Sequence, residues 1–387
     1  MNTAVSQNEC TLLVAGREYR GWTRLEIQRS MEHVDGGFVL QLTTRWPGQD
    51  APVYLREGLA CEVRLGDDTV ITGYIDDFET DDTDTTTSMS VHGRDKTGDL
   101  VDCSAVFKTG QWRNVRLEQI VRDLAAPFGI QVVVATNTGE VFKHFALEES
   151  EKVFDAIDRA CRLRAVLVTS APTGNLLLTH ASTQSTGVAL VEGVNMKKFS
   201  SKHSWRERFK TITMKAQGPG DDFESGASVA HLKALATDPE IDRYRPLIVV
   251  AEHGTSAKAL QDRAVWERQV RMGRGKRGQC TVVGWRTGLD GQQGPLWQPN
   301  TLVRVTSARM QVDMDLLIVA CSYQLTEQGC VTELTFARRE AFELVPGVGS
   351  SRLNAKLNDK TQKEKRQRDD GFTPSWQLPP PNPRSTQ

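Results

Sequence analysis

The chain has 387 residues, of which 39% are hydrophobic and 25% are charged, and its formal net charge at pH 7 is −1. These values are typical of a soluble globular protein with about two or three domains, and the near-zero charge excludes a global attraction to nucleic acid or acidic lipid. No apolar run of about 18 residues predicts a membrane helix, and the N-terminus MNTAVSQNEC has neither the basic nor the apolar region of a signal peptide.

Residues 1–102 are predicted to form a β domain. Apolar residues alternate with polar ones on both sides of an Asp-Gly-Gly turn at residues 35–37, at Leu25, Ile27, Phe38, Leu40 and Leu42. This pattern is typical of a β-hairpin. A longer hairpin is predicted from VITGYIDDF through the acidic, Thr-rich ETDDTDTTTS to MSVHGRD. Many short strands, separated by turns such as WPGQD and LGDDT, indicate a barrel or a sandwich.

Residues 103–192 are predicted to form a small α+β unit. Apolar residues recur at helical spacing at Leu117, Ile120, Val121, Leu124 and Phe128. We expect this helix to have its N-cap at Asn114 and to end at Gly129. A second helix is predicted in SEKVFDAIDRACRL, with Ser150 as its N-cap, and a hairpin around residues 172–175 follows it.

Residues 193–345 are predicted to form a second β domain with an inserted helix and a long loop. A strand near FKTITMKAQ is followed by the polar loop GPGDDFESG, a buried strand in PLIVVAEH, and a helix in TSAKALQDRAVWERQVRM that ends at Gly273. The strands QCTVVGW, TLVRVTSA, DLLIVACSYQL and VTELTFARR complete this domain. Residues 346–387 are expected to contain a hinge, a charged helix and a Pro-rich tail.

The two β domains show a weak internal repeat. In both, a Leu and a turn precede a strand, a loop, a long strand with an aromatic residue near its end, and a last strand closed by Arg. The matching positions are Phe78 with Tyr323, Arg94 with Arg338, and Leu100 with Leu344. The repeat predicts two similar β domains that flank the α+β unit.

The segment GRGKRG at residues 273–278 matches the GxGxxG pattern. A dinucleotide fingerprint needs a strand before it and a helix after it, whereas here a helix precedes and a strand follows, which favours a Gly-rich connecting loop. The region is also basic, at Arg268, Arg271, Arg274, Lys276 and Arg277. A solvated helix end stabilised by the helix dipole is favoured, and a phosphate-contacting patch is the alternative.

No constellation typical of catalysis or metal binding occurs in the sequence. The seven His are dispersed, at residues 33, 92, 144, 180, 203, 231 and 253, without metal-ligand spacing. Adjacent acids point apart on a strand, at Asp67/Asp68, Asp76/Asp77 and Glu148/Glu149. GxSxG, HExxH and Walker motifs are absent. We therefore predict no catalytic, cofactor-binding or metal-binding residues, no cofactor, and a protein that is not an enzyme.

Three further features of the sequence are interpreted as structural rather than functional. The seven dispersed Cys, with no CxxC pair, indicate reduced thiols rather than a disulfide framework. The basic KEKRQR near the C-terminus favours a solvated face over a lipid or nucleic-acid site. Core packing at strand ends is favoured over interface anchoring for the Trp residues near turns, which are Trp22, Trp46, Trp112, Trp285, Trp297 and Trp376.

Several segments together resemble the baseplate hub proteins of contractile-tailed, Mu-like bacteriophages. They are YRGWTRLEIQRSMEHVDGGFVLQLTTRWPG, VITGYIDDF, VHGRDKTGDLVDCSA, LEQIVRDLAAPFGI and LWQPNTLVRVTS. The most specific part is GRDKTGDLVDCSA, and the resemblance covers roughly residues 10–345. The N-terminal parts of type VI secretion spike proteins are more distantly similar.

The resemblance implies a homotrimeric ring in which each subunit supplies two tube-type β domains around a channel. Such a ring would join a sixfold tail tube, or its initiator proteins, to a threefold central spike and to other baseplate proteins. The implied location is the tail baseplate of a virion assembled in the host bacterial cytoplasm, without membrane contact. Specific nucleic-acid recognition is not expected, although DNA would pass through the channel. The family carries no catalytic residues, so none is transferred to this chain.

Three other interpretations remain open. The parent particle could be a phage-derived tail-only device, such as a bacteriocin or a secretion machine, and neighbouring capsid genes would separate the two. A peptidoglycan-degrading tail enzyme would clear a zymogram. A nucleic-acid-binding module that uses the basic cluster at 268–277 would retain DNA in a salt-dependent way.

Overall fold

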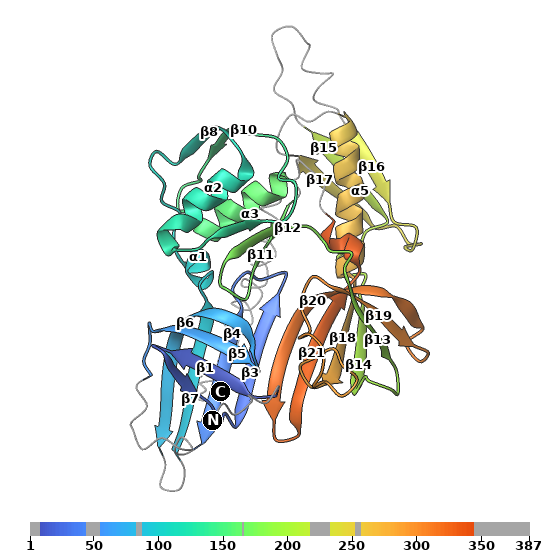
Figure 1. Ribbon diagram of the computed structural model, residues 1–387. Coiled ribbons are helices and arrows are strands. Elements are labelled where there is room, and N and C mark those ends of the chain that lie inside the picture. The colour runs from blue at the N-terminus through green and yellow to red at the C-terminus, as the bar shows by residue number, and fades with distance from the viewer. Residues whose placement is uncertain are drawn as a thin grey trace, which may run out of the picture. The chain divides into compact units, whose positions relative to one another are not determined.

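The computed structural model describes residues 8–43, 55–82, 87–164, 166–216, 233–251 and 257–343. Strands dominate these residues, in one 13-stranded sheet and three small sheets (Figure 1). The predicted fold class, mainly β with a small α+β unit, is confirmed. All described residues belong to one compact unit of the chain, Met1–Val348. Within them, no helix is both long and apolar enough to cross a membrane.

The first β domain contains the N-terminal strands of the large sheet. They are β1 (Cys10–Val14), β2 (Arg17–Tyr19), β3 (Arg24–Ser30), β4 (Gly37–Thr43), β5 (Ala60–Leu65), β6 (Asp68–Asp82) and β7 (Thr87–Asp95). The predicted hairpin at residues 25–42 is confirmed, because Leu25 pairs with Leu40 and Ile27 with Phe38. All four side chains are at most 3% exposed, so the period-two pattern of the sequence marks the face that packs in the core.

The α+β unit follows directly and has a core of its own. Its elements are α1 (Gly98–Asp102), β8 (Gln111–Val115), α2 (Leu117–Ala125), the 3-10 helix η1 (Ala126–Phe128), β9 (Val132–Val134), β10 (Phe142–Ala146), α3 (Val153–Leu163), β11 (Leu167–Ser170) and β12 (Leu176–Thr179). The two predicted N-caps are wrong, since Arg116 and Lys152 occupy those positions. Asn114, which lies in β8, and Ser150 instead have positive φ, 54° and 61°.

The second β domain contains the remaining strands of the large sheet. They are β13 (Ser185–Val191), β14 (Lys198–His203), β18 (Lys276–Val283), β19 (Leu302–Ser307), β20 (Val312–Thr326) and β21 (Gly329–Ala337), and the 3-10 helix η2 (Arg339–Phe342) follows them. The expected boundary after residue 192 assigned β13 to the α+β unit. In the structure β13 pairs in parallel with β19, more than a hundred residues away, and local sequence patterns do not report such a pairing.

A third small layer is inserted between β14 and β18. It consists of β15 (Thr211–Ala216), β16 (Lys233–Thr237), β17 (Pro246–Ala251) and α5 (Ala257–Arg274), and it has a separate hydrophobic core. The expectation that PLIVVAEH is a buried strand is wrong, because Ile248 and Val250 on β17 are 59% and 55% exposed. One face of this sheet packs on α5, and Leu235, Ile248 and Val250 on the other face are exposed.

The internal repeat has the same strand lengths in both β domains. β5, β6 and β7 contain 6, 15 and 9 residues, and β19, β20 and β21 contain 6, 15 and 9 residues. Both long strands have a β-bulge near the middle, after Ile75 and after Ile318. Aligned at these bulges, Phe78 corresponds to Cys321, so the sequence pattern that matched it with Tyr323 was shifted by two residues.

Some predicted features lie outside the described residues. They are the WPGQD turn, the tip of the β6–β7 hairpin at 83–86, the GPGDDFESG loop, Leu344, and the hinge, helix and tail of residues 346–387.

Candidate interaction surfaces

The two β domains join edge to edge through β3 and β20. Six residue pairs form this antiparallel junction, from Ala320 opposite Ser30 to Leu325 opposite Leu25. At one end, the Met31 amide donates to the Val319 carbonyl at 2.8 Å. On one face of the junction Ile27 and Tyr323 are at most 1% exposed. On the other face, the Ser322 hydroxyl donates to Glu26 Oε1 at 3.1 Å. The large sheet is therefore continuous from one domain to the other (Figure 1).

Ion pairs reinforce the same junction from the second β domain. Arg277 Nη1 lies 2.7 Å from Glu32 Oε2. Burial alone would raise the pKa of Glu32, but the hydrogen bond and the charge of Arg277 lower this pKa below its ordinary value. Arg286 reaches back to the first domain, with Nη2 2.7 Å from Asp68 Oδ2 and 3.2 Å from the Leu65 carbonyl. These contacts bridge about two hundred residues of sequence and could not be assigned from spacing.

Several edges of the large sheet are uncovered among the described residues, including the terminal strands β2 and β13. Two further edges, β14 and the distal half of β6, carry opposite charge. β14 is a terminal strand of the sheet, paired only with β18. The distal half of β6, residues 76–82, pairs with β7 but has no described strand on its other side. Asp76, Asp77, Glu79 and Asp81 make this segment acidic and are exposed, whereas Lys198, Lys202 and His203 make β14 basic. Sequence reasoning missed both edges, although the runs YIDDFETDD and MKKFSSKH carry the signal.

The GRDKTGD segment clamps the first β domain to the α+β unit. Arg94 contacts Asp76 and Asp102, each at 2.7 Å. Asp95 is 3% exposed and accepts hydrogen bonds from the amides of Gly36 and Thr97, both at 3.1 Å, and from the Thr97 hydroxyl. That hydroxyl also contacts the Val34 carbonyl. Burial is the main cause that raises the pKa of Asp95 above its ordinary value. The polar side chains of this segment therefore hold the first β domain and the α+β unit together.

Two glycines of GRGKRG, Gly273 and Gly275, allow close packing. A Cβ at Gly273 would lie 2.1 Å from the Cβ of Ala341, and one at Gly275 would lie 2.7 Å from the Arg208 side chain. A helix, α5, precedes the segment and a strand, β18, follows it. The phosphate-binding alternative for GxGxxG therefore lacks its strand–loop–helix context, and the Gly-rich connection that we favoured is what the structure contains.

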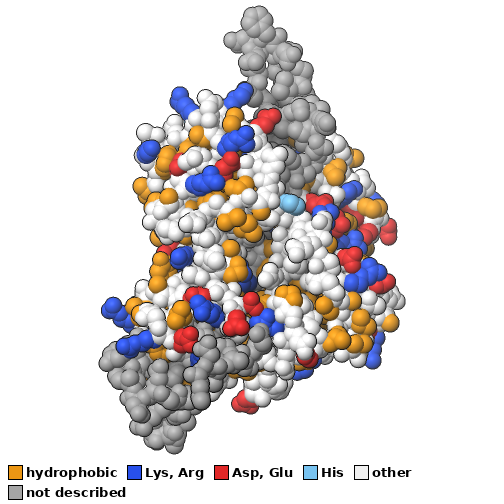
Figure 2. Space-filling view, viewed as in Figure 1, with side chains coloured by type: hydrophobic (Ala, Val, Ile, Leu, Met, Phe, Trp, Pro, Cys, Tyr) orange, Lys and Arg blue, Asp and Glu red, His pale blue; other side chains and the backbone are white. Residues whose placement is uncertain are grey.

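Carboxylates neutralise much of the predicted basic cluster. Arg271 pairs with Glu267 at 2.7 Å, Lys276 with Glu240 at 2.7 Å, and Arg277 with Glu32. Arg208, which the sequence analysis did not single out, is 1% exposed and contacts Asp238 at 2.8 Å. On the face in Figure 2, Lys and Arg side chains are interspersed with Asp and Glu. Such mixed charge does not favour a phosphate-binding patch.

The other predicted side chains are dispersed. Among the described residues no group of three His, Cys, Asp or Glu is arranged to hold a metal ion. His92 contacts Ser90, His180 contacts Thr136, and His231 and His253 lie outside the described residues. Of the adjacent acids, Asp68 pairs with Arg286 and Asp76 with Arg94. The described Trp residues near turns are core residues, at most 6% exposed: Trp22, Trp112, Trp285 and Trp297.

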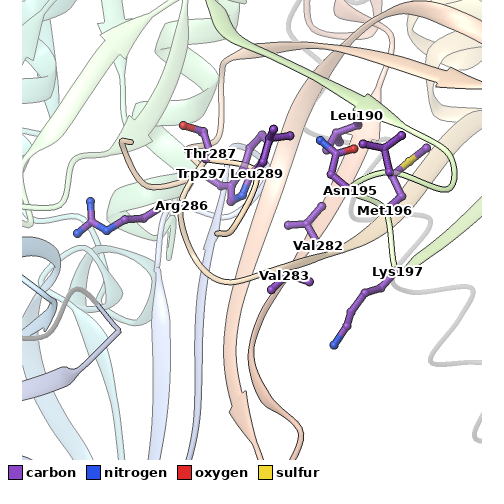
Figure 3. Close-up of a pocket in the computed structure, with 12 residues that line it drawn as sticks. Leu190, Asn195, Met196, Lys197, Val282, Val283, Arg286, Thr287, Leu289 and Trp297 are labelled. Carbon is purple, nitrogen blue, oxygen red and sulfur yellow. The ribbon is translucent and has the colours of Figure 1, made fainter. Parts of the chain in front are cut away.

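One shallow cavity of about 100 Å³ lies in the second β domain, between the β13–β14 connection, β18 and the segment that follows β18 (Figure 3). Asn195 is held by the Val191 amide at 2.8 Å, and Trp297 is buried in the wall. Arg286 points away from the cavity toward the first domain (Figure 3). Because the volume is below the several hundred Å³ typical of ligand sites, the cavity does not favour small-molecule chemistry.

Family models match four parts of the chain. The descriptions are "Mu phage baseplate assembly protein GpP-like, N-terminal" at residues 9–95, "Baseplate hub protein gp44-like, second domain" at 97–180, "Tail protein NMB1110-like, third domain" at 208–265, and "Mu phage baseplate assembly protein GpP, fourth domain" at 255–345.

Individual relatives agree with these matches. The chain is 38% identical to the baseplate hub protein gp44 of Escherichia phage Mu over 91% of its length and 93% of that protein. It is similar to the crystal structure of the 43 kDa tail protein of prophage MuSo2 from Shewanella oneidensis, with 38% identity, a TM-score of 0.78, and coverage of 87% and 100% of the two chains. A tail protein of Neisseria meningitidis MC58 has the same fold, with 24% identity, a TM-score of 0.74, and coverage of 88% and 98%.

Proposed function

Because the chain belongs to the baseplate hub proteins of Mu-like phage tails, we propose that three copies of it form a closed ring around the axis of a contractile tail. In this ring each copy contributes its two β domains, so the wall contains six related domains. One side of the ring meets the sixfold tail tube or its initiator, and the other side meets the threefold central spike. Other baseplate proteins attach to its outside.

The observation that carries this proposal is the β3–β20 junction. Two domains with the same strand lengths and the same bulge are joined side by side in one continuous sheet. A head-to-tail junction of this kind closes into a ring when the rotation between neighbours divides a full turn. Closure would also cover two open sheet edges, β14 and the distal half of β6, and covering such edges reduces the hazard of aggregation.

The proposed role is mechanical rather than catalytic. The relatives of the chain include a baseplate hub protein, a prophage tail protein and a tail protein. Several charged side chains form ion pairs that join structural units, as Arg94, Arg277 and Arg286 do. We propose that assembly takes place in the host bacterial cytoplasm and that DNA passes through the channel without sequence-specific contacts.

Deleting the gene from its parent phage or prophage and inducing particle formation tests this role. The proposal expects particles without functional baseplates and tails, and a return of contractile tails when the wild-type chain is supplied from a plasmid. Normal, infective tails without the protein would overturn it. If the wild-type particles have tails but no heads, the hub serves a tail-only device instead. A zymogram that clears peptidoglycan with the purified chain would show an enzyme instead.

A further inference from the structure

Within the ring proposed above, on which this inference depends, neighbouring copies must join through specific strands. We propose that β14 of one copy pairs antiparallel with the distal half of β6 of the next copy. The pairing uses the same register that joins β3 and β20 within the chain. It places Glu79 of one copy opposite Lys202 of its neighbour.

The first step is that β6 and β20 are equivalent strands. The Ile75 carbonyl accepts from the Gly58 amide at 2.7 Å, and the Ile75 amide donates to the Leu59 carbonyl at 3.0 Å. Ile318 makes the same two bonds with Asn300 and Thr301, at 2.8 and 2.9 Å. Gly58 and Asn300 both have positive φ, 78° and 61°. Counted from these anchors, residues 77–81 of β6 correspond to residues 320–324 of β20.

The second step is that β3 and β14 are equivalent strands. In the first domain Ile27 pairs with Phe38, which pairs with Gly93. In the second domain Ser201 pairs with Gly278, which pairs with Phe336.

The irregular bonds that precede the two strands also match. The Thr23 amide donates to the Gln41 carbonyl at 2.9 Å, and the Lys197 amide donates to the Thr281 carbonyl at 2.8 Å. In the regular ladder Gln41 pairs with Arg24 and Thr281 pairs with Lys198, so each of these bonds comes from the residue before the regular partner. Residues 26–30 of β3 therefore correspond to residues 200–204, which are the end of β14 and the residue that follows it.

The third step is that equivalent residues of the two repeats differ in exposure: those at the internal β3–β20 junction are buried, and their counterparts on β6 and after β14 are more exposed. On β20, Cys321 and Tyr323 are each 1% exposed because β3 covers that edge. The corresponding Phe78 is half-buried against the core, and Thr80 is exposed. The same contrast holds on the other strand. Met31 is 7% exposed, while Trp205 at the corresponding position is 41% exposed. The β3–β20 junction is therefore made within the subunit. The equivalent junction, between β14 and β6, is not made within the subunit.

The fourth step is that the charges of the two open edges are complementary. Transfer of the β3–β20 register places Asp77 opposite Ser204, Phe78 opposite His203, Glu79 opposite Lys202, Thr80 opposite Ser201, and Asp81 opposite Ser200. The hydroxyl-to-carboxylate bond of Ser322 and Glu26 at the internal junction has a counterpart between Ser200 and Glu79, with the two strands exchanged. Opposite charges across a strand pair favour the pairing, and this complementarity identifies a second copy of the chain as the occupant of each edge.

Paired cysteines test the register directly. The bond from Met31 to Val319 makes Gln28 and Ser322 a non-hydrogen-bonded pair by alternation along the ladder. Glu79 and Lys202 would be the equivalent pair, with Cα atoms about 4.5 Å apart, a distance that a disulfide spans. The variant is therefore Glu79→Cys with Lys202→Cys, in a background where the exposed Cys103 is replaced by Ser. Both sites are exposed in the subunit, so the reduced variant should fold as the wild type does.

The matched control is Thr80→Cys with Lys202→Cys in the same background, since neighbouring strand residues point to opposite faces. After mild oxidation at a concentration where wild type is trimeric, the proposal expects covalent dimer and trimer on a non-reducing gel for the 79/202 variant. The 80/202 variant and each single-cysteine variant should stay monomeric on that gel. A trimeric wild type with equal cross-linking at 79/202 and 80/202 overturns this register but keeps the ring. A wild type that never forms a trimer overturns the ring itself.

Discussion

Phe38 on β4 lies directly over Gly93 on β7, so that a Cβ at position 93 would be 2.5 Å from a Phe38 ring atom. The second β domain has the reverse arrangement at the corresponding pair, with Gly278 on β18 and Phe336 on β21. Each domain therefore fills one position of its core with one ring and one glycine, and the strand that supplies the ring is exchanged. At this position the two copies therefore share the packing arrangement but not the sequence.

Substitution of that glycine should destabilise the first β domain. In Gly93→Ala the new methyl group would meet both the Phe38 ring and the Tyr74 carbonyl, which lies 2.3 Å from the Cβ position. We expect a loss of about 1–3 kcal/mol, as for overpacked cores, measured as a lower midpoint of urea unfolding. Gly37→Ala is the control, because its Cβ would have no neighbour nearer than 3.8 Å. Equal midpoints for the two variants would contradict the packing account.

Removal of the Asp95 carboxylate should loosen the attachment of the α+β unit. In Asp95→Ala the buried amides of Gly36 and Thr97 lose their acceptor, and each unsatisfied buried donor costs about 1–3 kcal/mol. The thermal midpoint should fall, and proteolysis should cut first near residues 95–103. Asp99→Ala, which removes an exposed carboxylate from the same turn, should change the midpoint little. A stable Asp95→Ala chain would show that the clamp is dispensable.

Several elements could be predicted from the sequence because their signals are local. The hairpin at residues 25–42 follows from alternation and a glycine turn, and two helices of the α+β unit, α2 and α3, follow from helical spacing. The position of β13 depends on a partner far away in the chain, which no local pattern encodes. The exposure of Ile248 on β17 was missed because an apolar run is equally typical of a buried strand.

The candidate surfaces were less predictable than the fold. Each of the residues Asp77, Glu79, Lys198 and Lys202 is an ordinary exposed charge in the sequence. Their importance emerges only when the structure shows that β6 and β14 are edges and that an equivalent pair of edges is already joined. The ion pair of Arg277 with Glu32 is likewise a contact between segments 245 positions apart, so the basic cluster could not be matched to its carboxylates beforehand.

Acid should weaken the contact between the inserted layer and β18. Hydrogen bonding to Lys276 is the largest cause that lowers the pKa of Glu240, from 4.5 to about 2. Since this pKa is depressed in the folded chain, the ionised carboxylate stabilises the fold above pH 4.5, and that stabilisation is lost as the pH falls toward about 2. Glu240→Gln should therefore be less stable than wild type at neutral pH, and the two should converge near pH 2.

Unfolding midpoints recorded by Trp fluorescence across this pH range measure the effect. Because Glu240 is partly exposed, solvent screening keeps the difference small. Glu57→Gln, which changes an exposed carboxylate of the first β domain, is the control and should track the wild type at every pH. A constant gap between Glu240→Gln and wild type down to the lowest pH would refute the assignment.

Reversal of one charge at the proposed junction should weaken assembly. Exchange of the two charges between Glu79 and Lys202 should restore it. Lys202→Glu places like charges opposite each other at every contact between copies, as does Glu79→Lys. Since opposed like charges on paired strands are destabilising, each single variant should shift the mass distribution toward the monomer, and more so at low salt. The double exchange should return toward the wild-type distribution. If the double variant is as defective as the sum of the singles, the two residues do not meet.

The most direct test of the hub account is the mass of the purified chain in solution, by light scattering on a sizing column, with electron micrographs of the same peak. The account predicts a species near three times the chain mass of 43.0 kDa, seen end-on as a ring with a central hole and six similar lobes. A monomer that persists at micromolar concentration and forms no ring when spike protein is added would contradict it.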